Sequence, residues 1–175
     1  AGLVPGIMRM KETLDCSLAI SLHAPTDAVR NVLVPINRKY PIKDLLAAAS
    51  EYIESKQSLR KLIIEYTLIE GVNDSPQDAA QLADLLKSVK CKINLIPFNT
   101  FDGSDYKSPK DQCVKAFQRR LVSAGHQVMI RSTRGSDIMA ACGQLAELSQ
   151  KDANESIECE SDEQREVALT FRETA

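Results

Sequence analysis

Apolar residues along the chain follow two alternating patterns. Short continuous apolar runs, which are typical of buried strands, lie at about 18–22, 62–69, 93–98 and 127–132. Between these runs apolar residues recur at helical spacing, which predicts amphipathic helices over about 42–55, 75–89 and 108–124, and a further helix around 138–145. The chain therefore reads as strand and helix in repeated succession.

Capping residues mark where two of the helices begin. Ser75-Pro76-Gln77-Asp78 places a hydroxyl at the N-cap, proline at the first helical position and an acid at the third. The segment Ser108-Pro109-Lys110-Asp111 repeats this pattern, so we expect the next helix to start there as well. Gly125 is a suitable residue to end that helix near Ala124.

Strands that are apolar throughout and alternate with helices favour the α/β class, with a parallel sheet under helical cover. Four such units are too few to close a barrel. They fit half of a (β/α) barrel or one wing of an open doubly wound sheet. We expect residues 1–147 to form this domain. Residues 148–175 are acidic and polar, and we expect a disordered tail there.

Length and composition limit the remaining possibilities. A chain of 175 residues with 43% hydrophobic residues can bury one sizeable core. It has no apolar stretch long enough to span a membrane and no signal-peptide pattern at its start. The sequence lacks an initiator Met and opens within a predicted helical segment, which leads us to expect an excised fragment.

Charge is divided unevenly along the chain. From Lys151 onward there are eight acidic and three basic residues, whereas residues 1–150 carry 19 basic and 16 acidic residues. The mildly basic body is compatible with RNA binding, although an ordinary solvated surface is the more common explanation for such a bias.

The five cysteines are scattered, and no C-x-x-C pair occurs. With only two histidines, we expect no metal site built from this chain alone. Reduced thiols of this kind are typical of a cytoplasmic protein.

Polar residues follow three of the predicted strands, where reactive groups collect in α/β folds. Ser21 and His23 end the first strand, Asn99 follows the third, and Cys142 comes after the fourth. Each also has a purely structural explanation. His23 can be a structural hydrogen-bond donor, Asn99 a turn residue and Cys142 a buried core residue. Taken singly, none establishes a function.

Taken as whole strings, these stretches resemble the RlmN family of radical-SAM RNA methyltransferases. The likeness runs in unbroken order over about residues 1–147. Its five strings are 18–25 (LAISLHAP), 33–40 (LVPINRKY), 70–74 (EGVND), 92–99 (KINLIPFN) and 134–145 (RGSDIMAACGQL).

The resemblance implies methylation of C2 of an adenine in 23S rRNA, and also in tRNA, with S-adenosylmethionine and a [4Fe–4S] cluster as cofactors. It implies that Ser21, Leu22 and His23 line the S-adenosylmethionine site and that Asn99 binds the same molecule. Cys142 would accept a methyl group from one S-adenosylmethionine. A radical made from a second would activate that methyl group for addition to adenine, and another cysteine would release the adduct through a transient disulfide. An electron donor such as flavodoxin is a further implied partner.

The C-x-x-x-C-x-x-C cluster motif of this family does not occur in the sequence, so we expect its ligands to lie upstream and the chain alone to be inactive. Ser136 and Met139 stand where the family usually has Asp, and Thr100 where it usually has Pro. Two alternatives stay open. One is a Cfr-like enzyme that methylates C8 of the same adenine, and the other is a truncated, non-catalytic RNA-binding remnant.

Overall fold

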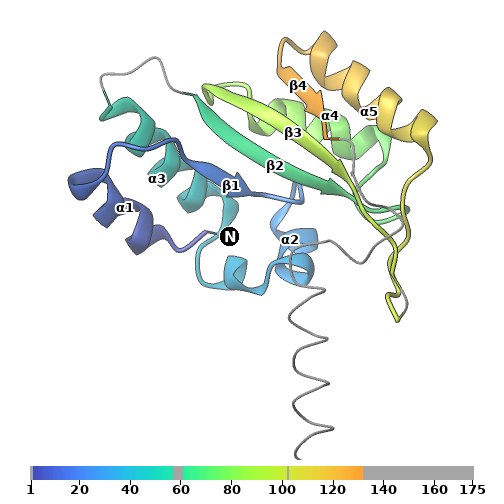
Figure 1. The fold of residues 1–175 in the computed structure, drawn as a ribbon, viewed down its shortest axis with the longest axis horizontal. Coiled ribbons are helices and arrows are strands. Elements are labelled where there is room, and N and C mark those ends of the chain that lie inside the picture. Colours follow the sequence, from blue (N-terminus) through green and yellow to red (C-terminus); the bar gives the residue numbers. More distant parts are fainter. Residues whose placement is uncertain (1, 57–60, 102, 132–175) are drawn as a thin grey trace, which may run out of the picture. The chain divides into compact units, whose positions relative to one another are not determined.

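The computed structural model describes residues 2–56, 61–101 and 103–131. Its centre is a sheet of four strands, all parallel, in the order β1-β2-β3-β4 (Figure 1). The strands are β1 (Ala19–Ser21), β2 (Leu62–Leu68), β3 (Cys91–Pro97) and β4 (Gln127–Ile130). The predicted α/β class with parallel strands is therefore confirmed, and each strand lies within two residues of its expected bounds.

Helices connect the strands. They are α1 (Val4–Thr13), α2 (Asp27–Leu33), the 3₁₀ helix η1 (Pro35–Arg38), α3 (Ile42–Glu54), α4 (Pro76–Leu85) and α5 (Asp111–Ser123). The helix predicted from residue 42 is confirmed as α3. The N-cap predicted at Ser75 is confirmed too, because Ser75 and Asp78 form a reciprocal capping box at the start of α4.

One face of the sheet packs against helices and forms the core. Along β2, alternate residues are buried, and Tyr66 among them packs against Phe117 of α5 with the rings tilted and their centroids 5.4 Å apart. Residues from α3, α4 and α5 complete the same cluster, with Leu45, Leu82 and Leu121 fully buried. This apolar burial is the main source of stability for the domain.

The opposite face is only partly covered within the described residues. Ile63, Glu65 and Thr67 of β2 are half-buried, and Lys92 of β3 is exposed. The parallel sheet under helical cover that the apolar runs predicted is present, with the helices of the described residues packed on one face. Polar residues at alternate positions of β2 and β3 mark this less covered face.

Helix α5 begins later than the sequence suggests. Its N-cap is Lys110, without a side-chain capping bond, and not Ser108. The preceding segment is held in a loop, because the backbone N–H of Ser108 donates to Thr100 Oγ1 (3.0 Å) and the N–H of Glu70 donates to the carbonyl of Lys107 (3.0 Å). These tertiary bonds replace the local cap that the sequence pattern predicts. The end of the helix is as expected, with Gly125 at φ +91°.

Helices α2 and η1 were not anticipated, since neither shows clear apolar periodicity. Cys142, the predicted helix around it, the expected domain boundary at 147 and the acidic tail all lie outside the described residues. Within those residues, no helix combines the length and apolar character needed to cross a lipid bilayer.

Candidate functional site

The turn after β1 carries three of the four residues predicted to bind the cofactor. Ser21 ends the strand, Leu22 is fully buried, and His23 adopts φ +59°. A positive φ is uncommon for a residue other than glycine and requires support from its surroundings. That support comes from the side chains of Arg30 and Asn73, and the backbone N–H of Thr67 fixes the direction of the His23 ring.

The His23 imidazole is held as a neutral ring of one tautomer. The backbone N–H of Thr67 in β2 donates to His23 Nδ1 over 3.0 Å, so the ring proton of the neutral form lies on Nε2. Burial, followed by the positive charge of Arg30, lowers the pKa of His23 from 6.5 to about 4. At neutral pH this side chain therefore presents Nε2–H as a hydrogen-bond donor.

Arg30 of α2 binds the backbone of the turn after β1. It is fully buried, its Nε donates to the carbonyl of Leu22 (2.9 Å), and its Nη2 donates to the carbonyl of Ser21 (3.0 Å). Burial lowers the pKa of Arg30, and the nearby negative charge of Asp27 acts in the opposite direction. The planar guanidinium can hold two successive carbonyls in one geometry, which an ammonium group cannot do as well.

A buried amide connects Arg30 to the start of the next helix. Arg30 Nη1 donates to Asn37 Oδ1 (2.7 Å), and Asn37 Nδ2 donates to Asp27 Oδ1 (2.8 Å) and to Asn31 Oδ1 (2.8 Å). Asp27 Oδ1 also accepts the backbone N–H of Ile42 at the start of α3 (2.9 Å). The turn after β1 is thus tied to α2, η1 and α3 by one polar network.

Asn73, also fully buried, fixes the other side of the turn. Its Nδ2 donates to the carbonyls of His23 (2.7 Å) and Thr67 (2.8 Å), and its Oδ1 accepts the N–H of Ile69 (2.7 Å). Its own carbonyl accepts the hydroxyl of Tyr66 (2.9 Å). Asn73 therefore joins the carboxyl ends of β1 and β2.

Asn99, the fourth predicted residue, is half-buried and follows the carboxyl end of β3 by two residues. Since β2 separates β1 from β3, the ends that carry His23 and Asn99 lie about 10 Å apart, twice the usual strand spacing. The structure thus brings Ser21, Leu22, His23 and Asn99 to one edge of the sheet. Cys142 lies outside the described residues.

Reasoning from sequence missed the residues that hold the site together. Asn37 and Asn73 stand inside two of the family-like strings, at 33–40 and 70–74, and buried asparagines in such strings were the available signal. Arg30 lies outside those strings, and only a tertiary structure shows that its charge is buried.

Metal-binding residues do not gather in the part of the chain that the structure describes. Cys16, Cys91 and Cys113 are free thiols that differ in exposure. No group of three or more His, Cys, Asp or Glu side chains there could hold a metal ion. The described residues therefore do not fit a [4Fe–4S] cluster.

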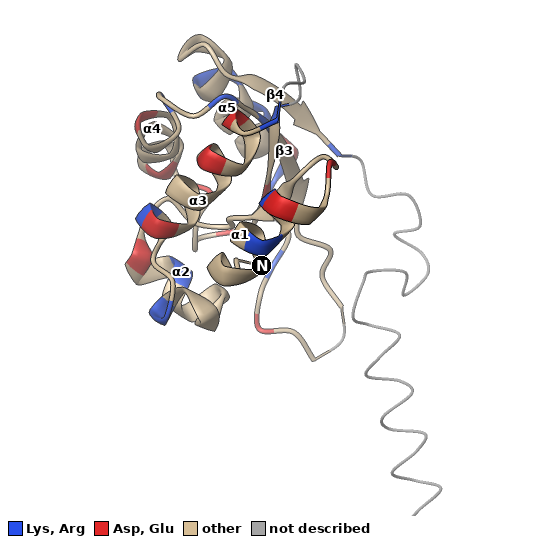
Figure 2. Cartoon of the chain, turned by 90° about the vertical axis from the view of Figure 1, so that its left-hand side faces the viewer, with Lys and Arg blue, Asp and Glu red and all other residues tan. Residues whose placement is uncertain are grey.

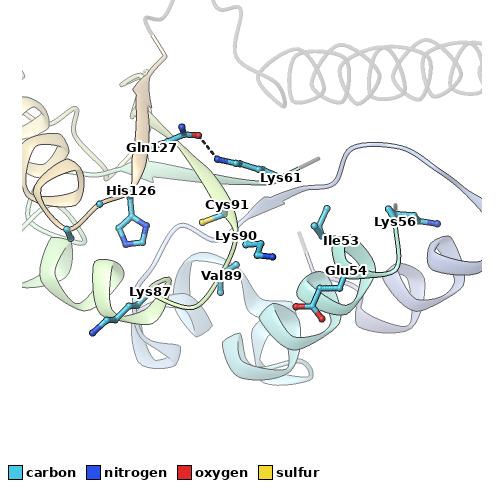
Figure 3. Close-up of a pocket in the computed structure, with 12 residues that line it drawn as sticks. Ile53, Glu54, Lys56, Lys61, Lys87, Val89, Lys90, Cys91, His126 and Gln127 are labelled. Atoms are coloured by element: carbon cyan, nitrogen blue, oxygen red, sulfur yellow. Dashed lines mark hydrogen bonds between the residues drawn. The ribbon is translucent and has the colours of Figure 1, made fainter. Parts of the chain in front are cut away.

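A separate hollow of about 640 Å³ lies at the amino-terminal ends of β2, β3 and β4 (Figure 3). Four lysines line it, and one of them, Lys61, donates to Gln127 Oε1 (3.1 Å). Residues at or just beyond the carboxyl ends of α3, α4 and α5 also line it. Lysines near helix carboxyl ends complement the helix dipoles, which is a structural role that needs no ligand.

Charge on the helices does not single out an RNA-binding face. Figure 2 shows acidic and basic residues interspersed over the helices on the side that it presents. The single ion pair among the described residues, Lys11–Glu51, is at the surface. The candidate site is recognised by the strand ends and the buried polar network, and not by a charged surface.

Two solved structures share the fold. A radical SAM methyltransferase from Sphaerobacter thermophilus matches with a TM-score of 0.77 and 44% identity, over 82% of this chain and 42% of that one. A domain of pyruvate-formate lyase-activating enzyme from Bacteroides vulgatus shares the fold with a TM-score of 0.54 and 22% identity, over 74% of this chain and 73% of that one. The fold of this chain therefore matches that of part of a radical SAM methyltransferase.

Similar curated proteins indicate which family of methyltransferases the chain resembles, although no family model matches the sequence. Proteins named dual-specificity RNA methyltransferase RlmN are 54% identical in a Marinomonas species and 55% identical in Marinobacter nauticus, each over 145 residues. The match covers 83% of this chain and 39% of each relative, so the chain spans about two fifths of their length. The chain belongs to the RlmN family, and the match is consistent with its C-terminal portion.

Proposed function

We propose that this chain forms part of a radical-SAM enzyme that methylates C2 of an adenine in 23S rRNA, and of an adenine in tRNA. The observation that carries the proposal is the identity of more than half with dual-specificity RNA methyltransferases over 83% of the chain. The geometry supports it, because the site residues lie at the strand ends where α/β folds bind their ligands.

The turn after β1 and Asn99 would bind S-adenosylmethionine, which supplies the methyl group when bound. The site offers donors suited to it, because neutral His23 presents Nε2–H and Ser21 presents a hydroxyl at the sheet edge. Leu22 is fully buried, and its carbonyl is bound by Arg30, so its part is to fix the backbone between Ser21 and His23. Asn99 adds an amide after the carboxyl end of β3, which β2 separates from β1.

Cys142 would carry the methyl group as a thioether before its transfer to RNA, since a thiolate is the side chain best able to accept a methyl group. The cluster ligands, an electron donor such as flavodoxin and the partner cysteine would act together with this portion in the cytoplasm. Since the sequence given has no C-x-x-x-C-x-x-C motif, the chain by itself would be inactive.

A chimera tests the proposal directly. The chain replaces the segment that it matches in the Marinomonas relative, and the chimera is expressed in a bacterial strain that lacks its own adenine-C2 methyltransferase. We expect mass spectrometry of 23S rRNA and tRNA nucleosides to show 2-methyladenosine. The chimera with Cys142→Ala and the chain alone should show none.

Other outcomes would identify the alternatives. The appearance of 8-methyladenosine would point to a Cfr-like specificity and contradict the proposed C2 site. A folded chimera that binds RNA but forms neither nucleoside would favour the non-catalytic remnant. Methylation by the chain alone would show that it is complete.

A further inference from the structure

A row of three polar side chains crosses the less covered face of the sheet. The strand register aligns Ser21 of β1 with Glu65 of β2, and Glu65 with Asn94 of β3. Residues aligned in this way in a parallel sheet point to the same face, and all three are half-buried. Glu65 lies between the buried residues Ile64 and Tyr66, so its side chain points away from the helices.

None of these three side chains has a hydrogen bond or an ion pair with the residues around it in the described part of the chain. Asn94 Oδ1 is buried from solvent and has no partner. The ion pair that the described residues form is Lys11–Glu51, at the surface. Among these residues, the Glu65 carboxylate therefore has no cation within 4 Å. A buried polar atom without a partner lowers stability, and such atoms in native proteins call for an explanation.

The row lies beside the proposed cofactor site. Ser21 belongs to both, and Glu65 precedes Thr67, the residue that binds the His23 ring, by two positions. Two residues of a strand span about 6.6 Å, so the row is one layer deeper along the sheet than His23 and Thr67. Glu65 and Asn94 therefore lie about one layer below a ligand held at the strand ends.

The chemistry of the row indicates which ligand group it would take. The Glu65 carboxylate and Asn94 Oδ1 are hydrogen-bond acceptors, so the ligand must bring donors. Neighbouring strands are about 4.8 Å apart, so both side chains can reach adjacent hydroxyls of one sugar ring. A neutral diol is favoured over an ammonium group, since the exposed Lys92 lies on the same face one layer away. Carboxylates are well suited to hold ribose hydroxyls through charge-assisted bonds.

We propose that Glu65 and Asn94 bind the 2′- and 3′-hydroxyls of an adenosine ribose, with Ser21 at the end of the same row. This inference rests on the proposed function and extends its cofactor site by two residues. Free hydroxyls at both positions belong to a free nucleoside such as the adenosine part of S-adenosylmethionine. An internal RNA nucleotide has its 3′-oxygen esterified, so the row selects the cofactor and not the RNA.

The test compares adenosine with 2′,3′-dideoxyadenosine as probes of the chain, with affinities from NMR titration of backbone amides. We expect the wild-type chain to bind adenosine at least about tenfold more tightly, since hydrogen bonds to a charged group contribute more than neutral ones. In Glu65→Gln this ratio should fall to about threefold or less, with the affinity for the dideoxy compound unchanged. Asn94→Ala should lower the ratio in the same direction.

The control is Glu12→Gln, the same exchange at an exposed position of α1, which should keep the wild-type ratio. Circular dichroism and thermal unfolding verify that each variant folds. The inference is wrong if the wild-type chain does not discriminate between the two nucleosides, or if Glu65→Gln weakens both equally. It is also wrong if Glu65→Gln leaves the affinity for adenosine unchanged and weakens binding of an adenosine-containing RNA oligonucleotide or of free methionine.

The two proposals fail in different ways. A chimera that methylates RNA, combined with a Glu65→Gln chain that still discriminates like wild type, would reject the inference and leave the proposed function intact. A ratio that falls in Glu65→Gln as expected, combined with a chimera that methylates nothing, would reject the proposed function and leave the nucleoside site intact.

Discussion

The backbone N–H of Thr67 and the Nδ1 atom of His23 form a 3.0 Å hydrogen bond that joins the turn after β1 to the neighbouring strand β2. This bond requires an unprotonated Nδ1, and so it is compatible only with the neutral ring. The depressed pKa of His23, the fixed tautomer and the shape of the turn are consequences of the same arrangement.

Stability should depend on pH through His23. Its pKa is about 4 when folded and 6.5 when unfolded, so unfolding takes up about one more proton between these values. The contribution is fully present above pH 6.5 and is lost progressively as the pH falls toward 4. Urea unfolding from pH 7.5 to 4 should show a steeper loss for wild type than for His23→Gln. Parallel curves would mean that the pKa of His23 is the same in the folded and the unfolded protein.

Removal of Arg30 should be strongly destabilising. In Arg30→Ala, the carbonyls of Ser21 and Leu22 and the Oδ1 of Asn37 lose their donors inside the protein, and we expect a loss of about 3–5 kcal/mol in the free energy of unfolding. Arg30→Lys should recover only part of this, because an ammonium lacks the planar fork. Arg38→Ala, at an exposed position, should change stability by less than about 0.5 kcal/mol. Similar urea midpoints for Arg30→Ala and Arg38→Ala would contradict the supporting role of Arg30.

Two asparagines of the sheet region should respond in opposite ways. Asn73→Ala leaves three backbone groups without their side-chain partner and should cost about 2–4 kcal/mol. Asn94→Ala removes an amide whose oxygen is buried without a partner, so we expect a change near zero or a small gain. Thermal unfolding of the two variants against wild type measures the difference. A large loss for Asn94→Ala would show that this amide has a stabilising role in the isolated chain.

The two Ser-Pro segments should also behave differently. Ser75→Ala removes a capping box and should cost about 1 kcal/mol, the usual value for an N-cap hydroxyl. Ser108→Ala should cost close to nothing, because Ser108 contributes its backbone N–H, and not a side-chain cap, to the structure. Chemical denaturation of both variants provides the comparison, and equal losses would place the start of α5 at Ser108 in solution.

The sequence predicted those parts of the fold that depend on local pattern. Helix α3, the cap at Ser75 and all four strands follow from apolar periodicity and capping residues. The start of α5 did not follow, because the hydrogen bond from Ser108 to Thr100 is tertiary. Ser21, Leu22, His23 and Asn99 could be located at strand ends, but Arg30 and Asn73 could not be identified as their support. That role arises only when segments far apart in the chain are brought together.

The position of β1 at one edge of the described sheet affects how the site opens. The strand has three residues and pairs with β2 alone in the described part of the chain, so its hydrogen-bond ladder is short. Arg30 and Asn73 supply much of the remaining attachment of the turn. The turn can therefore open as a small cooperative unit while β2 and β3 stay paired. Amide hydrogen exchange would then be faster at Leu22 than at the central residues of β2, and the lifetime of the closed turn would set how quickly a ligand enters and leaves.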